Sequence, residues 1–457
     1  MQKIKNYIFR AKPERYGVNM GIKVTKFGGS SLADANQIRK VQNILASDPT
    51  RRYMVPSAPG KRFKDDDKIT DLLYKCHDIA TTGKKIDSVF EQIRTRYLQI
   101  AEQLGVTLDV SAELDTIYER ISAGEKKDYA ASRGEYLNGK IIASALGWDF
   151  VDAAEVIRFN QKGIFDAELT NQLMADELAK HEYAIIPGFY GSRPDGTIKT
   201  FSRGGSDITG SIVARAVGAE LYENWTDVSG FMVVDPRIVD DPKTIHTITY
   251  RELRELSYMG ATVLHEDAIF PVSSCGIPIN IRNTNIPEAE GTMIVSKVKE
   301  SRNLSNVTGI AGKKNFTVIH LEKDMMNVER GFGRKVLTVL EENNISFEHL
   351  PTGIDNMSLV VSDKELDGKA DKVIADIKAR VTPDIVELQT GMALIAVVGR
   401  AMVHSFGTAG KVFSALGDAG INVRMIDQGS SELNIIVGVD NDCFEKAINV
   451  IYNAFFN

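Results

Sequence analysis

The stretch Ile22-Lys-Val-Thr-Lys-Phe-Gly-Gly-Ser-Ser31 decides the fold class of this chain. Residues 22–27 predict a short strand, and the glycines that follow predict a turn. Apolar side chains then recur at helical spacing, at Ile38, Val41, Ile44 and Leu45. Ser31 followed by Asp34 resembles a capping pair that would fix where this helix begins. We therefore expect a strand, a glycine turn and a helix in direct succession.

The same alternation of strands and helices continues to about residue 300. Extended or apolar runs predict strands near Met54 and Val55, at Ala184 to Pro187, at Glu220 to Trp225 and at Pro278 to Arg282. Helical patterns occupy much of the segment from Thr70 to Leu104. This alternation predicts a layered α/β domain with a mainly parallel sheet. We place that domain at residues 22–300, after an N-terminal extension formed by residues 1–21.

An internal repeat begins beyond residue 300. A shift of 76 residues places Lys335 on Lys411 and Leu340 on Leu416, and no gap is needed further along. Each copy shows the order strand, helix, strand, strand, helix, which is typical of a ferredoxin-like module of about 70 residues. The chain is therefore expected to end in two related modules.

The second copy stops before its last strand, so another segment must supply that strand. The apolar run Val307 to Ala311, just before the first copy, is the expected donor. We predict a first module at residues 316–390, nested inside a second module formed by residues 305–311 and 391–457.

Composition limits the possible functions. The 457 residues suffice for about three domains, and 55 basic against 61 acidic side chains give a formal charge of −6. Without a dense basic stretch, nucleic-acid binding is not expected. No run of about 18 apolar residues could span a membrane, and no hydrophobic segment follows the basic residues at the N-terminus as an export signal would require. The separated Cys76, Cys275 and Cys443 indicate neither a disulfide framework nor a zinc site, which fits a reducing cytoplasm.

The glycine turn after residue 27 is the first candidate binding site. Lys26 stands at a strand end, and the backbone N–H groups of the turn precede a helix, an arrangement that suits a phosphate. A lysine there adds a positive charge for a transferring phosphoryl group. A glycine-containing turn without any ligand explains the same residues.

Three further clusters contain groups suited to binding. Ser202-Arg-Gly-Gly-Ser-Asp207 offers an arginine fork for a carboxylate and an aspartate for cations, or is an exposed turn with a helix cap at Ser206 or Asp207. Trp225-Thr-Asp-Val-Ser-Gly230 could bind a nucleotide at a sheet edge, or form an Asx turn beside a partly buried tryptophan. Ser132-Arg-Gly-Glu135, which we place at the start of a helix, could hold an amino group or complement the helix dipole.

Two acidic segments superficially suggest metal sites. Lys64-Asp-Asp-Asp-Lys68 is better explained as a solvated loop, because consecutive acidic residues cannot all converge on one ion. His265-Glu-Asp267 lacks a second histidine at the spacing of a zinc-binding helix. The identity of any metal ligand is left open.

Taken together, KFGGSS, SRGE, FSRGGSD, WTDVSGF and DPR, followed by LSYMGATVLH and a doubled C-terminal module, closely resemble the aspartate kinases. The resemblance spans nearly the whole chain after Met20. It implies an amino-acid-kinase (carbamate-kinase-like) three-layer domain followed by two ferredoxin-like ACT domains. It also implies phosphorylation of the β-carboxylate of L-aspartate by ATP with Mg²⁺, the first step toward lysine, threonine and methionine.

The resemblance also implies roles for individual residues. Lys26 and Asp207 match the catalytic positions, with Asp207 orienting Lys26. The matching substrate positions are Thr70, Glu135, Arg203, Gly204, Gly205 and Ser206, with Glu135 toward the amino group and Arg203 toward a carboxylate. The matching nucleotide positions are Lys26, Phe27, Gly28, Gly29, Thr226, Asp227, Met232 and Arg237. Two residues depart from the family pattern: Met232 replaces a frequent tyrosine, and Thr262 replaces a frequent lysine near ATP.

In the first ACT module, the segments that match the family's effector site are 326–333 and 346–348. Its matching residues are Met326, Glu329, Gly331, Phe332, Gly333, Ser346, Phe347 and Glu348. Lysine is the expected feedback effector and threonine the alternative, while a turn and core without any ligand would explain the same residues. Because ACT modules associate edge to edge, the resemblance implies a homodimer or homotetramer.

Two other functions are compatible with parts of this pattern. One is a different small-molecule kinase of the same fold, acting on glutamate, N-acetylglutamate or a nucleoside monophosphate; the doubled module and WTDV argue against it. The other is an amino-acid sensor without turnover, against which Lys26, Arg203 and Asp207 argue.

Overall fold

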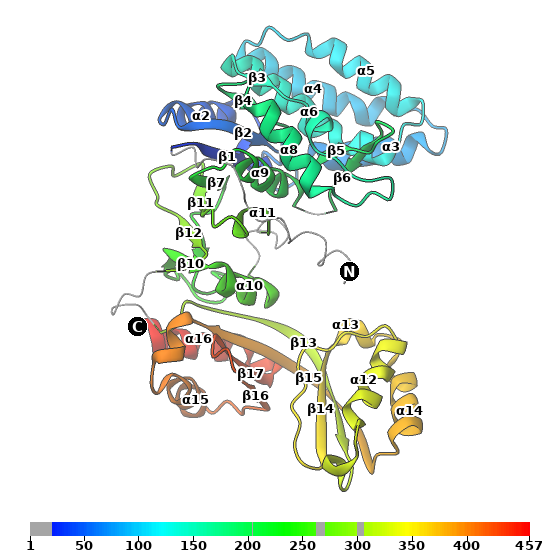
Figure 1. Ribbon diagram of the computed structural model, residues 1–457, viewed down its shortest axis with the longest axis vertical. Helices are drawn as coiled ribbons and strands as arrows, with labels where there is room; N and C mark the ends of the chain where they lie inside the picture. The colour runs from blue at the N-terminus through cyan, green and yellow to red at the C-terminus, as the bar shows by residue number, and fades with distance from the viewer. Residues whose placement is uncertain (1–20, 203, 262–269, 299–305) are drawn as a thin grey trace. The chain divides into compact units, whose positions relative to one another are not determined.

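The computed structural model describes residues 21–202, 204–261, 270–298 and 306–457 (Figure 1). The chain divides into two compact units. The first unit comprises Met1–Phe231, Thr244–Arg251 and Thr262–Lys299. The second unit comprises Met232–Lys243, Glu252–Ala261 and Glu300–Asn457. Two short segments before residue 262, which we predicted as part of the catalytic domain, thus group with the C-terminal modules.

The first unit is built on an eight-stranded sheet. Its order is β10 (Thr247–Thr249), β12 (Thr292–Val295), β11 (Ile279–Asn283), β7 (Leu221–Thr226), β1 (Lys23–Phe27), β2 (Arg51–Pro56), β4 (Ala184–Ile185) and β3 (Asp149–Phe150). Every neighbouring pair is parallel except β11 and β12. The predicted α/β class with a mainly parallel sheet is confirmed. The central strand β1 carries the turn from which the sequence analysis started.

Helices cover both faces of this sheet. They are α2 (Ala35–Ala46), α3 (Ile69–Ala80), α4 (Asp87–Leu104), α5 (Val110–Ser122), α6 (Lys127–Leu146), α7 (Ala153–Val156), α8 (Ala167–Leu178), α9 (Gly205–Ala216) and α11 (Phe270–Ser273). On one face, Phe27, Met54 and Trp225 join a core cluster with residues of α2 to α6. On the other face, α9 packs on β1, β2 and β7 (Figure 1). Because successive residues of a strand face opposite sides, Phe27 enters the core cluster while Lys26 lies toward α9.

Short elements complete the first unit and its edges. They are the hairpin strands β5 (Tyr190–Ser192) and β6 (Ile198–Thr200) and the strand β9 (Thr244–Ile245). The strand β8 (Phe231–Met232) and the helix α10 (Tyr250–Tyr258) each have residues in both units.

Two expected helix starts are wrong. A short 3-10 helix, Gly29–Leu32, follows β1, and Asp34 alone caps α2 by accepting from the backbone N–H of Gln37. Ser31 instead contacts the hydroxyl of Thr284 at 2.8 Å. Glu135 lies in the middle of α6 rather than in a first turn, because the apolar pattern extends back to Lys127. It therefore cannot complement a helix dipole, whose effect is confined to the terminal turn.

The second unit contains a five-stranded sheet in which all pairs are antiparallel. Its order is β14 (Asn356–Ser362), β13 (Gly309–Glu322), β15 (Ile385–Val398), β17 (Asn434–Asp440) and β16 (Met425–Asp427). The strands β13 and β15 each continue beyond one module into the other. Gly309–Ala311 pairs with residues 396–398, and Phe316–Glu322 pairs with residues 385–392, so one continuous strand pair serves both copies.

The helices of the second unit belong to the two copies. They are α12 (Phe332–Glu342), α13 (Asp363–Leu366) and α14 (Ala370–Val381) in the first, and α15 (Thr408–Asp418) and α16 (Phe444–Phe456) in the second. The repeat is exact at one strained position: Gly331 and Gly407 precede α12 and α15 with φ of 80° and 79°, which a side chain would disfavour. The second strand expected in the first copy forms only isolated bridges, such as His349 with Val360.

Among the described residues, none of the helices is both long and apolar enough to cross a membrane.

Candidate active site

A cavity of about 190 Å³ in the first unit gathers residues from distant parts of the sequence. Its lining residues are Lys26, Ser57, Thr70, Glu135, Phe189, Gly204, Gly205, Ser206 and Asp207. They come from the end of β1, the segment after β2, the start of α3, the middle of α6 and the start of α9. The cavity therefore unites the glycine turn, SRGE and RGGSD clusters, which the sequence leaves more than 60 residues apart.

Lys26 carries the positive charge of this cavity and is 7% exposed. Its Nζ lies 2.6 Å from Oδ1 of Asp207, at the first turn of α9. A second polar neighbour, Asn224 on β7, donates from Nδ2 to the same Asp207 oxygen at 2.8 Å. Sequence reasoning missed Asn224, although its position one residue before Trp225 places it next to Lys26 once β1 and β7 are paired.

The glycine turn is held from two sides. The Gly28 N–H donates to the carbonyl of Trp225 at 2.9 Å, and the Gly60 N–H donates to the carbonyl of Gly29 at 2.8 Å. A Cβ on Gly60 would lie only 2.6 Å from the carbonyl carbon of Gly29. A side chain at residue 60 would therefore collide with backbone atoms, and glycine fits where these two loops cross. The ring of Phe27 stacks on Trp225, which fixes the strand end beneath the turn.

Glu135 brings a buried carboxyl group into the cavity. It is 5% exposed, and its Oε2 has no hydrogen-bond partner among the described residues. Burial raises the pKa of Glu135 to about 8, although the backbone N–H of Ala58 acts in the opposite direction. Asn138, one turn further along α6, donates to the carbonyl of Ser57 at 2.7 Å. An unpaired buried acid of this kind is suited to a cationic ligand.

The start of α9 forms the opposite wall. Gly204 has φ of 58° and precedes the helix, and no side chain caps it, so the alternative interpretation of Ser206 or Asp207 as a helix cap is wrong. A Cβ on Gly205 would collide with Phe189, which explains the second glycine of the motif. The N–H groups in the first turn of a helix have no partner within the helix, and they favour an anionic ligand. Arg203 lies outside the described residues.

The other predicted nucleotide residues are distributed over both units. Thr226 and Asp227 lie at the carboxyl end of β7, beside β1, where ligands of parallel sheets commonly bind. Asn283 donates to the carbonyl of Asp227 at 3.3 Å and holds this turn. Trp225 is completely buried rather than partly exposed. Met232 is half-buried and, like the exposed Arg237, belongs to the second unit. Thr262 lies outside the described residues.

Arg237 is bound within its own turn. Its guanidinium pairs with Asp235 two residues earlier, at 2.5 Å. This pairing explains why the Asp-Pro-Arg sequence forms a compact turn. It leaves the other guanidinium donors facing solvent, because the side chain is largely exposed.

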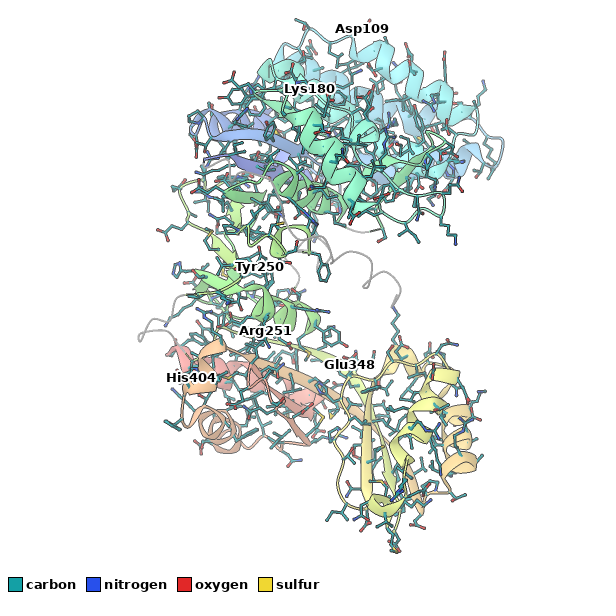
Figure 2. All side chains as sticks on the ribbon, in the orientation of Figure 1. Asp109, Lys180, Tyr250, Arg251, Glu348 and His404 are labelled. Atoms are coloured by element: carbon teal, nitrogen blue, oxygen red, sulfur yellow. The ribbon has the colours of Figure 1, made fainter. Side chains whose placement is uncertain are left out.

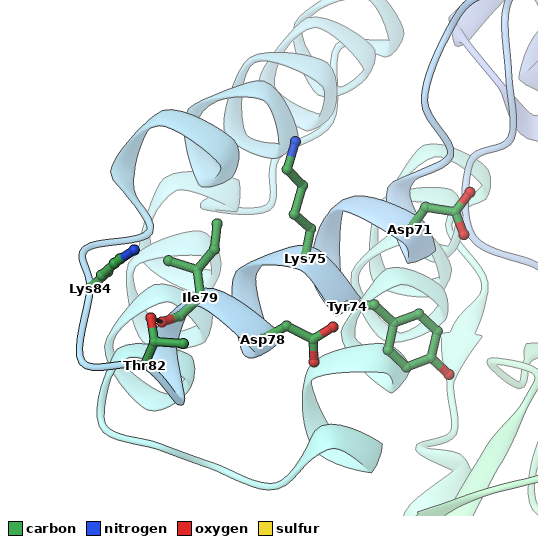
Figure 3. A pocket seen from close by; sticks show the side chains of 7 residues that line it. All are labelled: Asp71, Tyr74, Lys75, Asp78, Ile79, Thr82 and Lys84. Atoms are coloured by element: carbon green, nitrogen blue, oxygen red, sulfur yellow. Dashed lines mark hydrogen bonds between the residues drawn. The ribbon is translucent and has the colours of Figure 1, made fainter.

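A larger hollow of about 470 Å³ runs along α3 (Figure 3). Its lining residues are Asp71, Tyr74, Lys75, Asp78, Ile79, Thr82 and Lys84. Figure 3 shows Lys75 and Tyr74 pointing to different sides of the helix rather than toward a common centre. Since charged groups do not converge there, the smaller cavity around Lys26 is the better candidate for chemistry.

The acidic loop after β2 is only partly solvated. Asp65 and Asp67 are exposed, as expected, but Asp66 is buried and binds Arg62 and Arg96. The two guanidinium groups hold the pKa of Asp66 well below its usual range. The described residues contain no group of three potential metal ligands. His265-Glu-Asp267 lies outside them.

The predicted effector residues lie in the first copy of the repeat, where Figure 2 labels Glu348. Met326 and Phe332 are buried in its core cluster, and Gly331 precedes α12. Glu329 is bound by Lys323 and Lys335, each at 2.6 Å. Both lysines hold the pKa of Glu329 below its usual range.

The second predicted effector segment is more open. Ser346 and Phe347 are exposed, whereas Glu348 is half-buried. The Glu348 N–H donates to the carbonyl of Val360 on β14 at 2.8 Å. Gly333 lies in the first turn of α12 and is also half-buried. The two segments therefore belong to one module, but part of the first is core.

Comparison with known proteins identifies the family. The model of the amino acid kinase family matches residues 21–283, and an ACT domain model matches residues 395–455. Aspartokinase 3 of Bacillus subtilis is 40% identical over 451 residues, covering 95% of this chain and 99% of that protein. The crystal structure of aspartate kinase from Clostridium acetobutylicum is 55% identical, with a TM-score of 0.88 and coverage of 95% of this chain and 99% of the other.

Aspartokinase III of Escherichia coli is a more distant relative. Its structure with aspartate and ADP is 27% identical, with a TM-score of 0.73 and coverage of 95% and 100%. Its structure with lysine and aspartate is 26% identical, with a TM-score of 0.72 and coverage of 96% and 100%. The match over most of the chain shows that this protein belongs to the amino acid kinase family and, within it, to the aspartokinases.

Proposed function

We propose that this protein transfers the γ-phosphoryl group of ATP to the β-carboxylate of L-aspartate, forming 4-phospho-L-aspartate. The observation that carries this proposal is the cavity in which a buried lysine, a buried unpaired carboxyl group and a helix N-terminus face one another. Such a cavity offers one positive and one negative anchor at close quarters, as a zwitterionic amino acid with an anionic side chain requires. The Escherichia coli relative binds aspartate and ADP, which supports aspartate as a substrate and an adenine nucleotide as the second ligand.

The substrate is proposed to bind between α3, α6 and α9. The carboxylate of Glu135 receives the ammonium group of aspartate and becomes ionised when that charge arrives. Thr70 on α3 and Ser206 on α9 both line the cavity and offer hydroxyl groups. Arg203 is proposed, from the family resemblance, to bind the α-carboxylate, and the N–H groups of Gly204, Gly205 and Ser206 add partial positive charge. The β-carboxylate is then directed toward Lys26.

The nucleotide is proposed to lie along the carboxyl ends of β1 and β7. Phe27, Gly28 and Gly29 are proposed to form the turn beside the phosphates, although the Gly28 N–H is already bound to the carbonyl of Trp225, and Lys26 contacts the transferring phosphoryl group. Thr226, Asp227, Met232 and Arg237 are the proposed contacts to the rest of the nucleotide. ATP would carry Mg²⁺, which proteins usually hold through one or two carboxylates plus the phosphates. Asp207 lines the cavity, and because Lys26 and Asn224 occupy its Oδ1, only its other oxygen would be available to the ion. The phosphates would therefore hold most of the ion, which would offset their charge.

The chain's own contribution is alignment and charge neutralisation. Phosphoryl transfer is accelerated mainly by positioning and electrostatic stabilisation. The β-carboxylate is ionised at neutral pH, so no general base is needed to activate it. Lys26, the backbone N–H groups of the glycine turn and those at the start of α9 reduce the repulsion between the anionic nucleophile and the anionic phosphates.

Regulation is proposed to act through the first ACT module. Lysine, with threonine as the alternative, would bind at Met326 to Gly333 and Ser346 to Glu348. The lysine bound by the Escherichia coli relative supports this effector class. The effector must bind one state of the enzyme better than another, because equal binding shifts no equilibrium. Assembly through these modules into a homodimer or homotetramer is part of the proposal.

Hydroxylamine trapping tests the reaction directly. An acyl phosphate reacts with hydroxylamine to give a hydroxamate, so wild-type protein with ATP should form hydroxamate with aspartate and not with glutamate, N-acetylglutamate or a nucleoside monophosphate. Lys26→Met should lower kcat by about 10² to 10³, as expected for loss of one preorganised charge, with a smaller effect on aspartate binding. Absence of hydroxamate with aspartate would refute the proposal.

Regulation needs its own measurement. Initial rates and light-scattering mass are recorded with saturating lysine and threonine, alone and together. If both quantities stay unchanged in all three conditions, the regulatory proposal is wrong, whereas the catalytic proposal is unaffected.

A further inference from the structure

Asn224 occupies a position that neither the motif nor the family resemblance singles out. On β7 it pairs in parallel register with Lys26 on β1, and Lys26 in turn pairs with Val55 on β2. On its other side, Asn224 pairs with Ile281 on β11. Residues in register on parallel strands face the same side of the sheet. Val55, Lys26, Asn224 and Ile281 therefore form one row of side chains on the face covered by α9. Asn224 is thus the polar neighbour of the lysine in a row that is otherwise apolar.

The amide group of Asn224 contacts both members of the Lys26–Asp207 ion pair. Its Nδ2 donates to Oδ1 of Asp207 at 2.8 Å, and its Oδ1 lies at a longer 3.4 Å from Nζ of Lys26. Nζ itself lies 2.6 Å from the same Asp207 oxygen. One carboxylate oxygen is therefore shared by an ammonium group and a neutral amide. Asn224 is only 4% exposed, so water competes little for these bonds.

This sharing matters because Lys26 has two anionic partners in turn. Before ATP binds, its charge is engaged by Asp207. To stabilise a transferring phosphoryl group, Nζ must turn toward the phosphate and loosen its bond to Asp207. The carboxylate of Asp207 is half-buried, with a side chain 18% exposed, and is destabilised when it loses the lysine. A second donor that stays on the oxygen lowers the free energy needed for that exchange.

Resting on the phosphoryl transfer proposed above, we propose that Asn224 is a positioning residue that holds Asp207 while Lys26 turns to the phosphoryl group. It touches no reacting atom and acts through these two residues. Without its amide, Asp207 would keep Lys26, and the γ-phosphoryl group would receive less of the lysine charge.

The test replaces the amide of Asn224 with an apolar side chain of similar volume. Asn224→Leu should lower kcat about tenfold and change the KM for aspartate less than twofold. Calorimetric titration without aspartate gives a second readout: the preference for ATP over ADP should shrink by a factor of about 3 to 10, because the γ-phosphoryl group contributes less. Asn224→Val, which suits a strand, gives the same information if the leucine variant does not fold.

A double-mutant cycle separates positioning from a general structural role. In the Lys26→Met background, Asn224→Leu should change neither kcat nor the ATP-over-ADP preference by more than twofold, because its target is already gone. Asn280→Leu is the matched control. It lies on β11 in register with Glu223 and makes none of the contacts of Asn224, so both readouts should stay within twofold of wild type.

Three outcomes would overturn the inference. They are an unchanged ATP-over-ADP preference in both Asn224 variants, an equal loss with and without Lys26, or the same loss in Asn280→Leu. Failure of the proposed function looks different, because then wild-type protein forms no hydroxamate from aspartate, whatever residue 224 is.

Discussion

The raised pKa of Glu135 makes the affinity for aspartate depend on pH. When the cavity is empty, burial keeps this carboxyl group protonated up to a pKa of about 8. Under the proposed function, only the ionised group binds the ammonium of the substrate. Each pH unit below the pKa lowers the ionised fraction tenfold, so binding must weaken as pH falls and strengthen as pH rises.

The size of the effect follows from the same value. With a pKa of about 8, roughly 1% of Glu135 is ionised at pH 6 and about half at pH 8. The KM for aspartate should therefore fall about fifty-fold between pH 6 and pH 8 and level off above pH 8.5. The kcat should change much less, because bound aspartate keeps the carboxylate ionised. Coupled detection of ADP release at each pH measures both constants.

Glu135→Gln is the matched control. It should raise KM and remove most of its dependence on pH over this range, because the amide does not titrate. A wild-type KM that is constant from pH 6 to pH 8, or a glutamine variant with the same slope, would refute the reasoning.

The same group affects stability, with a sign that can be checked. The folded protein keeps the proton on Glu135 up to a pKa of about 8, whereas the unfolded chain releases it near the ordinary glutamate pKa of 4.5. The stability contribution of this proton is therefore complete below pH 4.5 and is lost as pH rises through 8. Between these two pH values, the free energy of unfolding should fall by up to about 1.4 kcal/mol for each unit that pH rises. Chemical denaturation should show that slope reduced in Glu135→Gln.

Two structural predictions concern the first unit and one the second. Gly60→Ala should lower kcat by at least tenfold, since the new Cβ would lie 2.6 Å from the backbone of Gly29 and displace the glycine turn. Turnover close to that of the wild type would show that the two loops can move apart without loss of activity. Gly410→Ala, with open space around its Cβ in the helix α15, should leave kcat unchanged and raise stability by up to about 1 kcal/mol; a lower melting temperature would contradict this. Arg51→Met removes the bidentate partner of the buried Glu223, which keeps the indole N–H of Trp225 and the more distant Arg282, and should lower the free energy of unfolding by about 1.5 to 3 kcal/mol in urea titrations; a loss below 1 kcal/mol would contradict it.

Much of the fold could be read from local pattern. The run from Ile22 to Ser31 predicted a strand and a glycine turn, and the apolar spacing predicted α2, because burial on one side leaves a periodic trace in sequence. The positions at which helices begin and end were harder to predict. The start of α2 was misplaced because Ser31 and Asp34 are both good caps, and the packing of Ser31 against Thr284 decides between them. The repeat likewise predicted two modules but not that β13 and β15 run through both.

The candidate site was predicted unevenly. Lys26 and Asp207 stand in glycine motifs and could be proposed from sequence, whereas Asn224 and Ser57 have no local signal. Their relevance depends on strand register and on which loop crosses the glycine turn. Asp66 illustrates the opposite error, because the sequence pattern predicts a solvated loop for the whole acidic run. Only its tertiary partner Arg96 distinguishes the buried Asp66 from the exposed acidic residues beside it.

The sequence alone determined the elements, the repeat and the residue types capable of chemistry, because these depend on short-range periodicity and on side-chain identity. Only the tertiary structure decided which of those residues meet. The pKa of Glu135 and the sharing of Asp207 by Lys26 and Asn224 arise from burial and distance between segments far apart in the chain. Electrostatic interactions depend on separation in space and on exclusion of water, and neither quantity is written in the order of the residues.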